Sequence, residues 1–310
     1  MNVTPKIILI GLAVLSLAAA SLSAAPLRVL YFTKSAGYEH SVIKQVDGAR
    51  SFSENLLTKW GPTHDMVFTF SKDGSKFSKA YLEQFDAIVF YTSGHLLSVG
   101  TDGHPAMTPE GKQALLDAIA GGKGFVGLHS CSDTFHTFES GGGNNPNREL
   151  RYKTHGEASD PFIRMLGGEF IRHGPQQVAK AKVIDPKFPG FEKLGSELNV
   201  NEEWYTLKDF APDIHVLLVM QTAGMDGFDY QRPNFPLAWA RNHGKGRVAY
   251  NAMGHREDVW ESEAFQSMLL GSIKWAGGLV KADVSPNLEK VAPDHGKFQP
   301  MPPPTPAKKE

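Results

Sequence analysis

The chain alternates between short apolar runs and longer segments in which apolar residues recur at helical spacing. The apolar runs predict buried strands at residues 27–33, 64–70, 85–92 and 123–128. Helical spacing predicts helices at 47–60 and 108–122, and Thr108 and Pro109 suit the start of the second one. Alternation of strands and helices is typical of an α/β fold with a mainly parallel sheet.

We expect a flavodoxin-like, doubly wound sheet with helices on both faces, because the run at 85–92 is apolar almost throughout. Ligands of such sheets lie beyond the carboxyl ends of the strands. The segments 34–40, 93–95 and 129–133 follow three of the predicted strands, and each ends in or begins with a histidine. The sequence therefore predicts a functional site at this edge of the sheet.

The second half of the chain continues the pattern less regularly. A short helix leading into a strand is predicted at 160–174, further strands at 177–185, 213–220, 235–241 and 246–253, and a closing amphipathic helix at 261–278. We expect residues 134–212 to elaborate the same sheet, so that residues 25–281 form one domain. Proline and charged residues are frequent in 282–310, which predicts a disordered tail.

The first 24 residues have the pattern of a secretory signal peptide. Lys6 is followed by an apolar run from Ile7 to about Ala20 and by small residues around Ala24. The run is shorter than the roughly 20 apolar residues of a membrane-spanning helix, so we expect cleavage and no stable membrane anchor. The sequence therefore predicts a periplasmic or secreted protein. One cysteine in the chain excludes an internal disulfide.

Basic and acidic residues are nearly balanced, with 32 Lys and Arg against 33 Asp and Glu. This balance favours neither a nucleic acid nor a membrane surface as a partner. We therefore expect a small polar ligand and no nucleic acid. No nucleotide cofactor is expected either. The sequence leaves the oligomeric state open.

Five of the twelve histidines follow strand-like runs or glycines, namely His40, His95, His129, His173 and His255. Each of them alone is more simply explained as a surface or loop histidine. Their shared position favours a polar pocket in which imidazoles act as acids, bases or metal ligands. No His-x-x-x-His or Cys-x-x-Cys spacing is present, so any metal would be held by residues distant in the sequence.

The segment "GLHSCSD" at 127–133 has the form of a strand-to-helix elbow. A nucleophile elbow needs small residues two positions before and after the nucleophile. For Cys131 these positions hold His129 and Asp133, whereas His129 has Gly127 before it. We therefore favour His129 as the functional residue of the elbow and Cys131 as a buried structural thiol. A thiol hydrolase that uses Cys131 is the less favoured alternative.

The segment "NEEWY" at 201–205 combines two carboxylates with two aromatic rings. In an extended chain Glu203 and Tyr205 share one face, while Glu202 and Trp204 take the other. A carboxylate beside a phenol suits acid–base or ligand work, and Trp204 suits stacking on a sugar ring. The alternative is a solvated acidic pair with an aromatic residue of the core.

Another polar cluster, "GHRED", follows the predicted strand at 246–253. Glu257 comes two residues after His255, which suits a carboxylate that orients the histidine ring. The alternative is the start of a solvated loop.

Several ordered motifs resemble one protein family. The motifs "GFVGLHS", "GGEFIRHG", "NEEWY", "PLAWARNHGKGRVAYNAMGH" and "GSIKWA" are similar to those of the ThuA-like (trehalose utilisation) family over residues 27–278. That family is similar in fold to the class I glutamine amidotransferases. Those enzymes have a cysteine in the elbow, where this chain has His129, so the resemblance does not imply glutaminase activity.

The resemblance implies a role in sugar catabolism beside oxidoreductases that convert glycosides to 3-keto forms. Family members are thought to hydrolyse or isomerise such keto-sugars, with or without a divalent metal. We expect His129, Glu203, Tyr205 and His255 as catalytic residues, His40, His95, Trp204 and Glu257 as substrate-binding residues, and His129 and His173 as metal ligands.

This chain departs from the family pattern at one motif. It has Glu202 and Glu203 where the family usually has an Asp-Glu pair, and the loop at 139–149 is variable in the family. A non-catalytic sugar-binding protein is the alternative of a different class.

Overall fold

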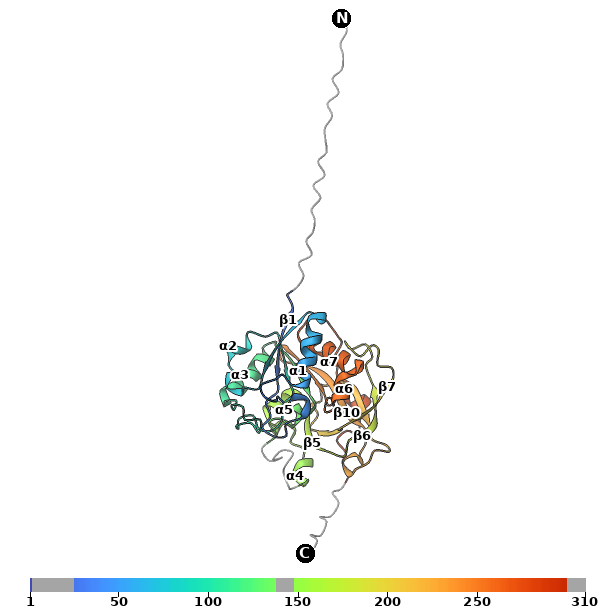
Figure 1. Ribbon diagram of the computed structural model, residues 1–310. Helices are drawn as coiled ribbons and strands as arrows, with labels where there is room; N and C mark the ends of the chain where they lie inside the picture. Colours follow the sequence, from blue (N-terminus) through green and yellow to red (C-terminus); the bar gives the residue numbers. More distant parts are fainter. Residues whose placement is uncertain (2–24, 138–147, 300–310) are drawn as a thin grey trace.

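The computed structural model describes residues 25–137 and 148–299, together with Met1. Within these residues nine strands form one sheet in the order β2-β1-β3-β4-β11-β10-β9-β6-β7, and β5 pairs separately with β8 (Figure 1). The strands are β1 Leu27–Phe32, β2 Met66–Ser71, β3 Ala87–Phe90, β4 Gly124–Leu128, β5 Glu169–His173, β6 Gln177–Val183, β7 Glu197–Glu202, β8 Tyr205–Lys208, β9 His215–Gln221, β10 Phe235–His243 and β11 Gly246–Asn251.

The helices flank this sheet (Figure 1). They are α1 Phe52–Trp60, α2 Lys79–Leu82, α3 Pro109–Ala120, α4 Arg148–Tyr152, α5 Pro161–Leu166, α6 Glu257–Glu261, α7 Glu263–Ala276 and α8 Leu288–Val291. None of the helices in the described part of the chain is long and apolar enough to cross a membrane. The predicted signal peptide at 1–24 and the loop at 139–149 fall largely outside the described residues.

Five neighbouring strands, β2, β1, β3, β4 and β11, form the parallel half of the sheet. β1 pairs in parallel with β2 and β3, and β4 pairs in parallel with β3 and β11. The order β2-β1-β3-β4 confirms the predicted flavodoxin-like α/β fold. β10, β9, β6 and β7 extend the sheet with antiparallel pairs. The irregular middle region therefore contributes β6 and β7 to the sheet, as expected, while β5 and β8 form a pair of their own.

Helices pack closely on both faces of β4, whose residues are all buried. A Cβ atom at Gly124 would lie 2.5 Å from the backbone of Ala276 at the end of α7. A Cβ atom at Gly127 would lie 2.9 Å from the side chains of Leu166 in α5 and Cys131. Because residues three apart in a strand point to opposite faces, α7 and α5 cover opposite faces of this strand.

The helix starts follow the expected capping chemistry. Thr108 accepts a hydrogen bond from the amide of Gly111, and Pro109 is the first residue of α3, as predicted. α1 begins at Phe52 and not near residue 47, because Ser51 and Glu54 form a capping box there. The expectation of a longer first helix was therefore wrong by one turn.

The expected disordered tail is corrected for residues 282–299. The side-chain amide of Asn287 makes two hydrogen bonds with the backbone of Val216. Its Oδ1 accepts from the N–H of Val216 at 2.7 Å, and its Nδ2 donates to the carbonyl of Val216 at 3.2 Å. It thus takes the place of a strand neighbour beside β9, while Leu288 and Ala292 bury their side chains. Composition alone did not reveal this docking, because only a few residues of the segment make the contacts with the rest of the protein. Residues 300–310 lie outside the described residues.

A buried charge network ties the segment after β4 to β5. Nδ1 of His136 lies 2.8 Å from a carboxylate oxygen of Glu169, and its Nε2 contacts the carboxylate of Asp133. Burial alone would lower the pKa of His136, but the two carboxylates outweigh it and raise this pKa to about 9. Burial alone would raise the pKa of Glu169, but contacts with His136 and Lys208 lower it to about 2. An ionised pair therefore fixes the segment that follows the elbow.

Replacing Gly124 with alanine should destabilise the protein by about 1–3 kcal/mol, because the added methyl group meets the backbone of α7. Urea unfolding of Gly124→Ala would measure this change. Gly296→Ala is the matched control, since a Cβ atom there meets nothing within 4 Å. Equal stability of the two variants would contradict the close packing of α7 on β4.

The stability that His136 provides should depend on pH. Its pKa is raised to about 9 in the folded protein, against about 6.5 when unfolded. The contribution is therefore fully present below about pH 6.5 and is lost as the pH rises through 9. We expect the difference in unfolding free energy between wild type and His136→Gln to fall by up to about 3 kcal/mol between pH 6 and pH 10. A difference that does not change with pH would show that His136 is neutral.

Candidate functional site

The elbow after β4 places His129 at the carboxyl edge of the sheet. His129 has a φ of 40°, in the left-handed region that is unfavourable for residues other than glycine. Two residues that are distant in the sequence hold this conformation. Tyr250 lies in β11, and Ala252 follows that strand. The hydroxyl of Tyr250 donates to the carbonyl of His129 at 2.7 Å, and Nδ1 of His129 lies 2.8 Å from the carbonyl of Ala252. The predicted elbow is thus confirmed as a strained turn with an imidazole at its tip.

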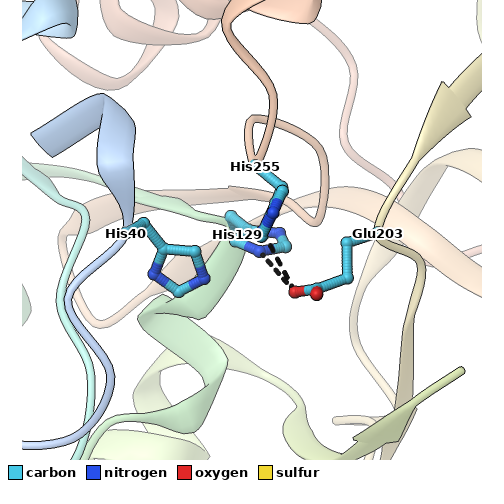
Figure 2. A group of neighbouring side chains, drawn as sticks. All are labelled: His40, His129, Glu203 and His255. Carbon is cyan, nitrogen blue, oxygen red and sulfur yellow. Dashed lines mark ion pairs between the residues drawn. The ribbon is translucent and has the colours of Figure 1, made fainter. Parts of the chain in front are cut away.

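His129 belongs to a group of four side chains that point toward one another (Figure 2). We call His40, His129, Glu203 and His255 the histidine–glutamate cluster. Each offers one ligand atom, and these atoms all lie within 4.8 Å of one another. The four residues come from the loops after β1, β7 and β11 and from the elbow after β4. Three of these segments follow parallel strands, which is why distant residues meet at this edge.

Glu203 lies at the centre of the contacts in the cluster. Its Oε2 atom is 3.5 Å from Nε2 of His129 and 3.1 Å from Nδ1 of His255. Burial alone would raise the pKa of Glu203, but the contacts with His129 and His255 outweigh it and hold this pKa well below its usual range. Burial alone would lower the pKa of His255, but Glu203 raises it above the usual value. Glu203 is therefore ionised in the cluster.

His40 is buried, with 2% of its surface exposed. Its ring centroid lies 4.8 Å from that of His129 and 5.1 Å from that of His255. Burial and the neighbouring imidazoles hold the pKa of His40 well below its usual value. This imidazole is therefore neutral and keeps a lone pair on one ring nitrogen.

The cluster fits a bound metal ion by its chemistry. Three imidazole nitrogens, Nδ1 of His40, Nε2 of His129 and Nδ1 of His255, are buried without an aligned hydrogen-bond partner among the described residues. Buried polar atoms are normally satisfied, so atoms left over in one place indicate a ligand. Imidazole nitrogens and a carboxylate are common metal ligands in proteins.

Tyr205 and His173 border the cluster. The ring of Tyr205 lies 4.1 Å from that of His129, and its hydroxyl is 3.5 Å from Nε2 of His40. Burial raises the pKa of Tyr205 well above its usual value, so the phenol keeps its proton. Nδ1 of His173 lies 3.4 Å from Oε1 of Glu203 and 2.9 Å from the carbonyl of Gly174. His173 is therefore close to the cluster, but it is not one of its four members.

Two residues that sequence reasoning did not select support the segment that carries His255. Glu202 is fully buried and accepts hydrogen bonds from the backbone N–H groups of Gly254 and His255, at 2.9 and 3.2 Å. Nε2 of Gln176 lies 2.9 Å from Nε2 of His255. The adjacent carboxylates of "NEEWY" were the available signal for a supporting residue beside Glu203. Gln176 has no comparable signal in the sequence.

Three expected substrate-binding residues lie elsewhere. Trp204 is fully buried and donates its indole N–H to the carbonyl of Gln177, so it cannot stack on a sugar. His95 is exposed and packs its ring near Phe135, outside the cluster. The fourth expected residue of this kind, His40, does lie in the cluster.

Glu257 is the third of these corrections. Its carboxylate accepts a hydrogen bond from Ser41 at 2.5 Å, and the carboxylate facing the ring of His255 belongs to Glu203. The expected pairing within "HRE" was therefore wrong: Glu257 is the first residue of α6, and Ser41 lies within its reach.

Cys131 is fully buried beneath the elbow. Its sulfur would lie 2.9 Å from a Cβ atom at Gly127, so the glycine makes room for the thiol. Burial raises the pKa of Cys131 well above its usual value, which keeps the thiol protonated. A protonated, inaccessible thiol is a poor nucleophile, in agreement with a structural role for Cys131.

Solved structures show the same fold. A ThuA-like protein from Bacteroides uniformis is 19% identical, with a TM-score of 0.57, covering 83% of this chain and 94% of that one. A ThuA-like protein from Parabacteroides merdae is 16% identical, with a TM-score of 0.53, covering 88% of this chain and 100% of that one. A cytoplasmic protein from Salmonella typhimurium is 15% identical, with a TM-score of 0.50, covering 80% and 99%.

A search of curated proteins finds no match. The family model for ThuA, described as trehalose utilisation, matches residues 28–276. This match spans β1 to α7 and includes all members of the histidine–glutamate cluster. The chain therefore belongs to the ThuA (trehalose utilisation) family.

Proposed function

We propose that this protein is an exported carbohydrate-processing enzyme that hydrolyses or isomerises 3-keto-glycosides by acid–base chemistry at the histidine–glutamate cluster. The observation that carries the proposal is the convergence of three imidazoles, one ionised carboxylate and one protonated phenol at the carboxyl edge of the sheet. Membership of a family described as trehalose utilisation supports a sugar as substrate.

A 3-keto-glycoside is suited to such a site because its ketone acidifies the neighbouring C–H bond. A base removes the proton from the carbon between the ketone and the anomeric carbon, and the electron pair forms an enolate. The enolate can then expel the glycosidic oxygen, which takes a proton from an acid, and water adds to complete hydrolysis. Return of a proton to the opposite face of the same carbon, without loss of the glycosidic oxygen, gives an isomer that is epimeric at that carbon.

His173 is suited to be the base. The carbonyl of Gly174 accepts a hydrogen bond from Nδ1–H of His173, and Oε1 of Glu203 lies on the same side at 3.4 Å. The lone pair therefore resides on Nε2, and the side chain is 41% exposed, so a substrate can reach it. A carboxylate that orients an imidazole is a common arrangement for a general base.

Tyr205 is suited to carry the proton that the leaving group or the enolate needs. Burial raises its pKa, so the phenol is protonated before the reaction and can act as the donor. Its ring lies parallel to that of His173, with 12° between the planes and 5.7 Å between the centroids. The proposed acid and base are thus neighbours.

The cluster itself would stabilise the negative charge that develops on the ketone oxygen. His129 and His40 lie next to Tyr205 and are held by the elbow and by burial. A divalent metal held by these residues would polarise the ketone as a Lewis acid. Fixed, buried groups stabilise such charge better than water does.

Export and supply of the substrate complete the proposal. The signal-peptide pattern at 1–24 supports a periplasmic or secreted location. A 3-keto-glycoside forms by two-electron oxidation of a glycoside, so an oxidoreductase that acts on sugars must supply the substrate.

The proposal predicts release of sugar from 3-keto-glucosides and none from the unoxidised glycosides. Tyr205→Phe should reduce kcat about 10²–10⁴-fold, since this is the range that a general acid contributes. Chromatography of the released sugar measures the rate. His95→Ala is the matched control, because it removes an imidazole outside the cluster, and it should retain nearly full activity.

Two outcomes would overturn the proposal. Binding of keto-glucosides without turnover, in wild-type protein assayed both with and without added divalent metal, would leave a sugar-binding protein. Wild-type rates in Tyr205→Phe would remove the phenol from the reaction.

A further inference from the structure

Three ring nitrogens in the cluster have no aligned hydrogen-bond partner among the described residues. They are Nδ1 of His40, Nε2 of His129 and Nδ1 of His255. His40 and His129 are at least nine-tenths buried, so water does not reach them freely. A carboxylate oxygen of Glu203 lies 3.5 Å from one of these nitrogens and 3.1 Å from another, without the alignment of a hydrogen bond. A single bound ion could therefore contact all of these atoms.

The protein fixes which nitrogen of His129 is available. Nδ1 of this ring lies 2.8 Å from the carbonyl of Ala252, which can only accept a hydrogen bond, so Nδ1 carries the proton. The nitrogen left for a ligand is consequently Nε2, which faces Glu203. A backbone carbonyl behind an imidazole is the usual support of a metal-binding histidine.

Two of the separations between these atoms also suit a small cation, and all four ligand atoms lie within 4.8 Å of one another. Ligands on a tetrahedral zinc ion lie about 3.3 Å apart, as follows from metal–ligand bonds of about 2.0–2.1 Å. The distances from Oε2 of Glu203 to His129 and His255 are 3.5 and 3.1 Å. Imidazole nitrogens favour zinc and other first-row transition metals, whereas Mg²⁺ and Ca²⁺ favour oxygen.

We propose that His40, His129, Glu203 and His255 bind one divalent transition-metal ion, with Zn²⁺ as the best match to the ligand set. His173 is not a ligand: its Nδ1 is held by the carbonyl of Gly174, and its side chain is 41% exposed. This proposed ligand set shares His129 with the expected pair of His129 and His173 and has His40, Glu203 and His255 in place of His173. The metal site shares its residues with the proposed function but does not depend on which substrate is used.

The site is held in place before any ion binds. Glu202 fixes the backbone at Gly254 and His255 through two hydrogen bonds. Tyr91 donates to the carbonyl of Gly254 at 2.9 Å, and Trp260 donates to the same carbonyl at 2.8 Å. Such preformed support lowers the cost of bringing ligands from distant parts of the sequence together.

Metal content of the tag-free protein tests this inference without any assay of activity. After dialysis against a chelator and then Zn²⁺, elemental analysis should find about one zinc per chain. Glu203→Gln and His129→Asn should bind at least 10-fold more weakly in a titration, in line with the loss of a ligand; asparagine tolerates the left-handed backbone at 129. His173→Ala and His95→Ala should bind as wild type does.

Substitution with Co²⁺ gives a second readout, because its visible absorption reports the ligands directly. The band should be present in wild type and in His173→Ala, and should be lost in Glu203→Gln. Wild-type protein that retains no metal, or Glu203→Gln and His129→Asn variants that bind as wild type does, would overturn the inference. Turnover of keto-glucosides by metal-free protein would contradict a role of the metal in the reaction but would support the proposed substrate. Bound metal without turnover would support the metal site but would contradict the proposed substrate.

Discussion

The left-handed turn at His129 is the constraint on which the rest of the site depends. A residue other than glycine pays about 1–2 kcal/mol for this backbone conformation, and His129 adopts it with a φ of 40°. Tyr250 and Ala252 offset the cost through contacts with the carbonyl and the ring of His129. Both follow from the parallel pairing of β11 with β4, which brings Tyr250 beside Gly127. The sheet therefore holds the strained turn, and the turn aims the imidazole at Glu203.

Charge in the site is organised around one carboxylate. Glu203 faces His129 and His255 with one oxygen and His173 with the other. Its neighbour Glu202 accepts hydrogen bonds from the backbone of the segment that carries His255. The two adjacent glutamates thus have different contacts, since Glu202 binds the backbone of this segment and Glu203 faces its side chain.

Much of the fold was predictable from the sequence because buried parallel strands leave nearly continuous apolar runs, as at β3 and β4. Spacing around the elbow indicated His129 and not Cys131 at its tip, because a glycine stands two residues before His129, and the structure has the turn there, with a φ of 40° at His129. The face pattern of "NEEWY" made Glu203 and Tyr205 candidates for the same site, and their joint role stays a prediction. These expectations rest on local geometry that the sequence encodes directly.

The errors have the opposite character. Trp204 is aromatic and lies next to the site, but the hydrogen bond to Gln177 that buries it comes from a distant segment. The contact between Glu257 and Ser41 joins residues far apart in the sequence, and so does the docking of Asn287 on β9. Composition does not reveal such single contacts. They require the three-dimensional arrangement.

The central claim is that His173, oriented by Glu203 of the cluster, removes a proton next to a sugar ketone. NMR of a 3-keto-glucoside incubated in D₂O tests it most directly. The account predicts deuterium at the carbon between the ketone and the anomeric carbon, at an early time and well above the level in buffer, with wild-type protein but not with Glu203→Gln. Sugar release without deuterium at that carbon, or equal incorporation with the variant, would contradict it.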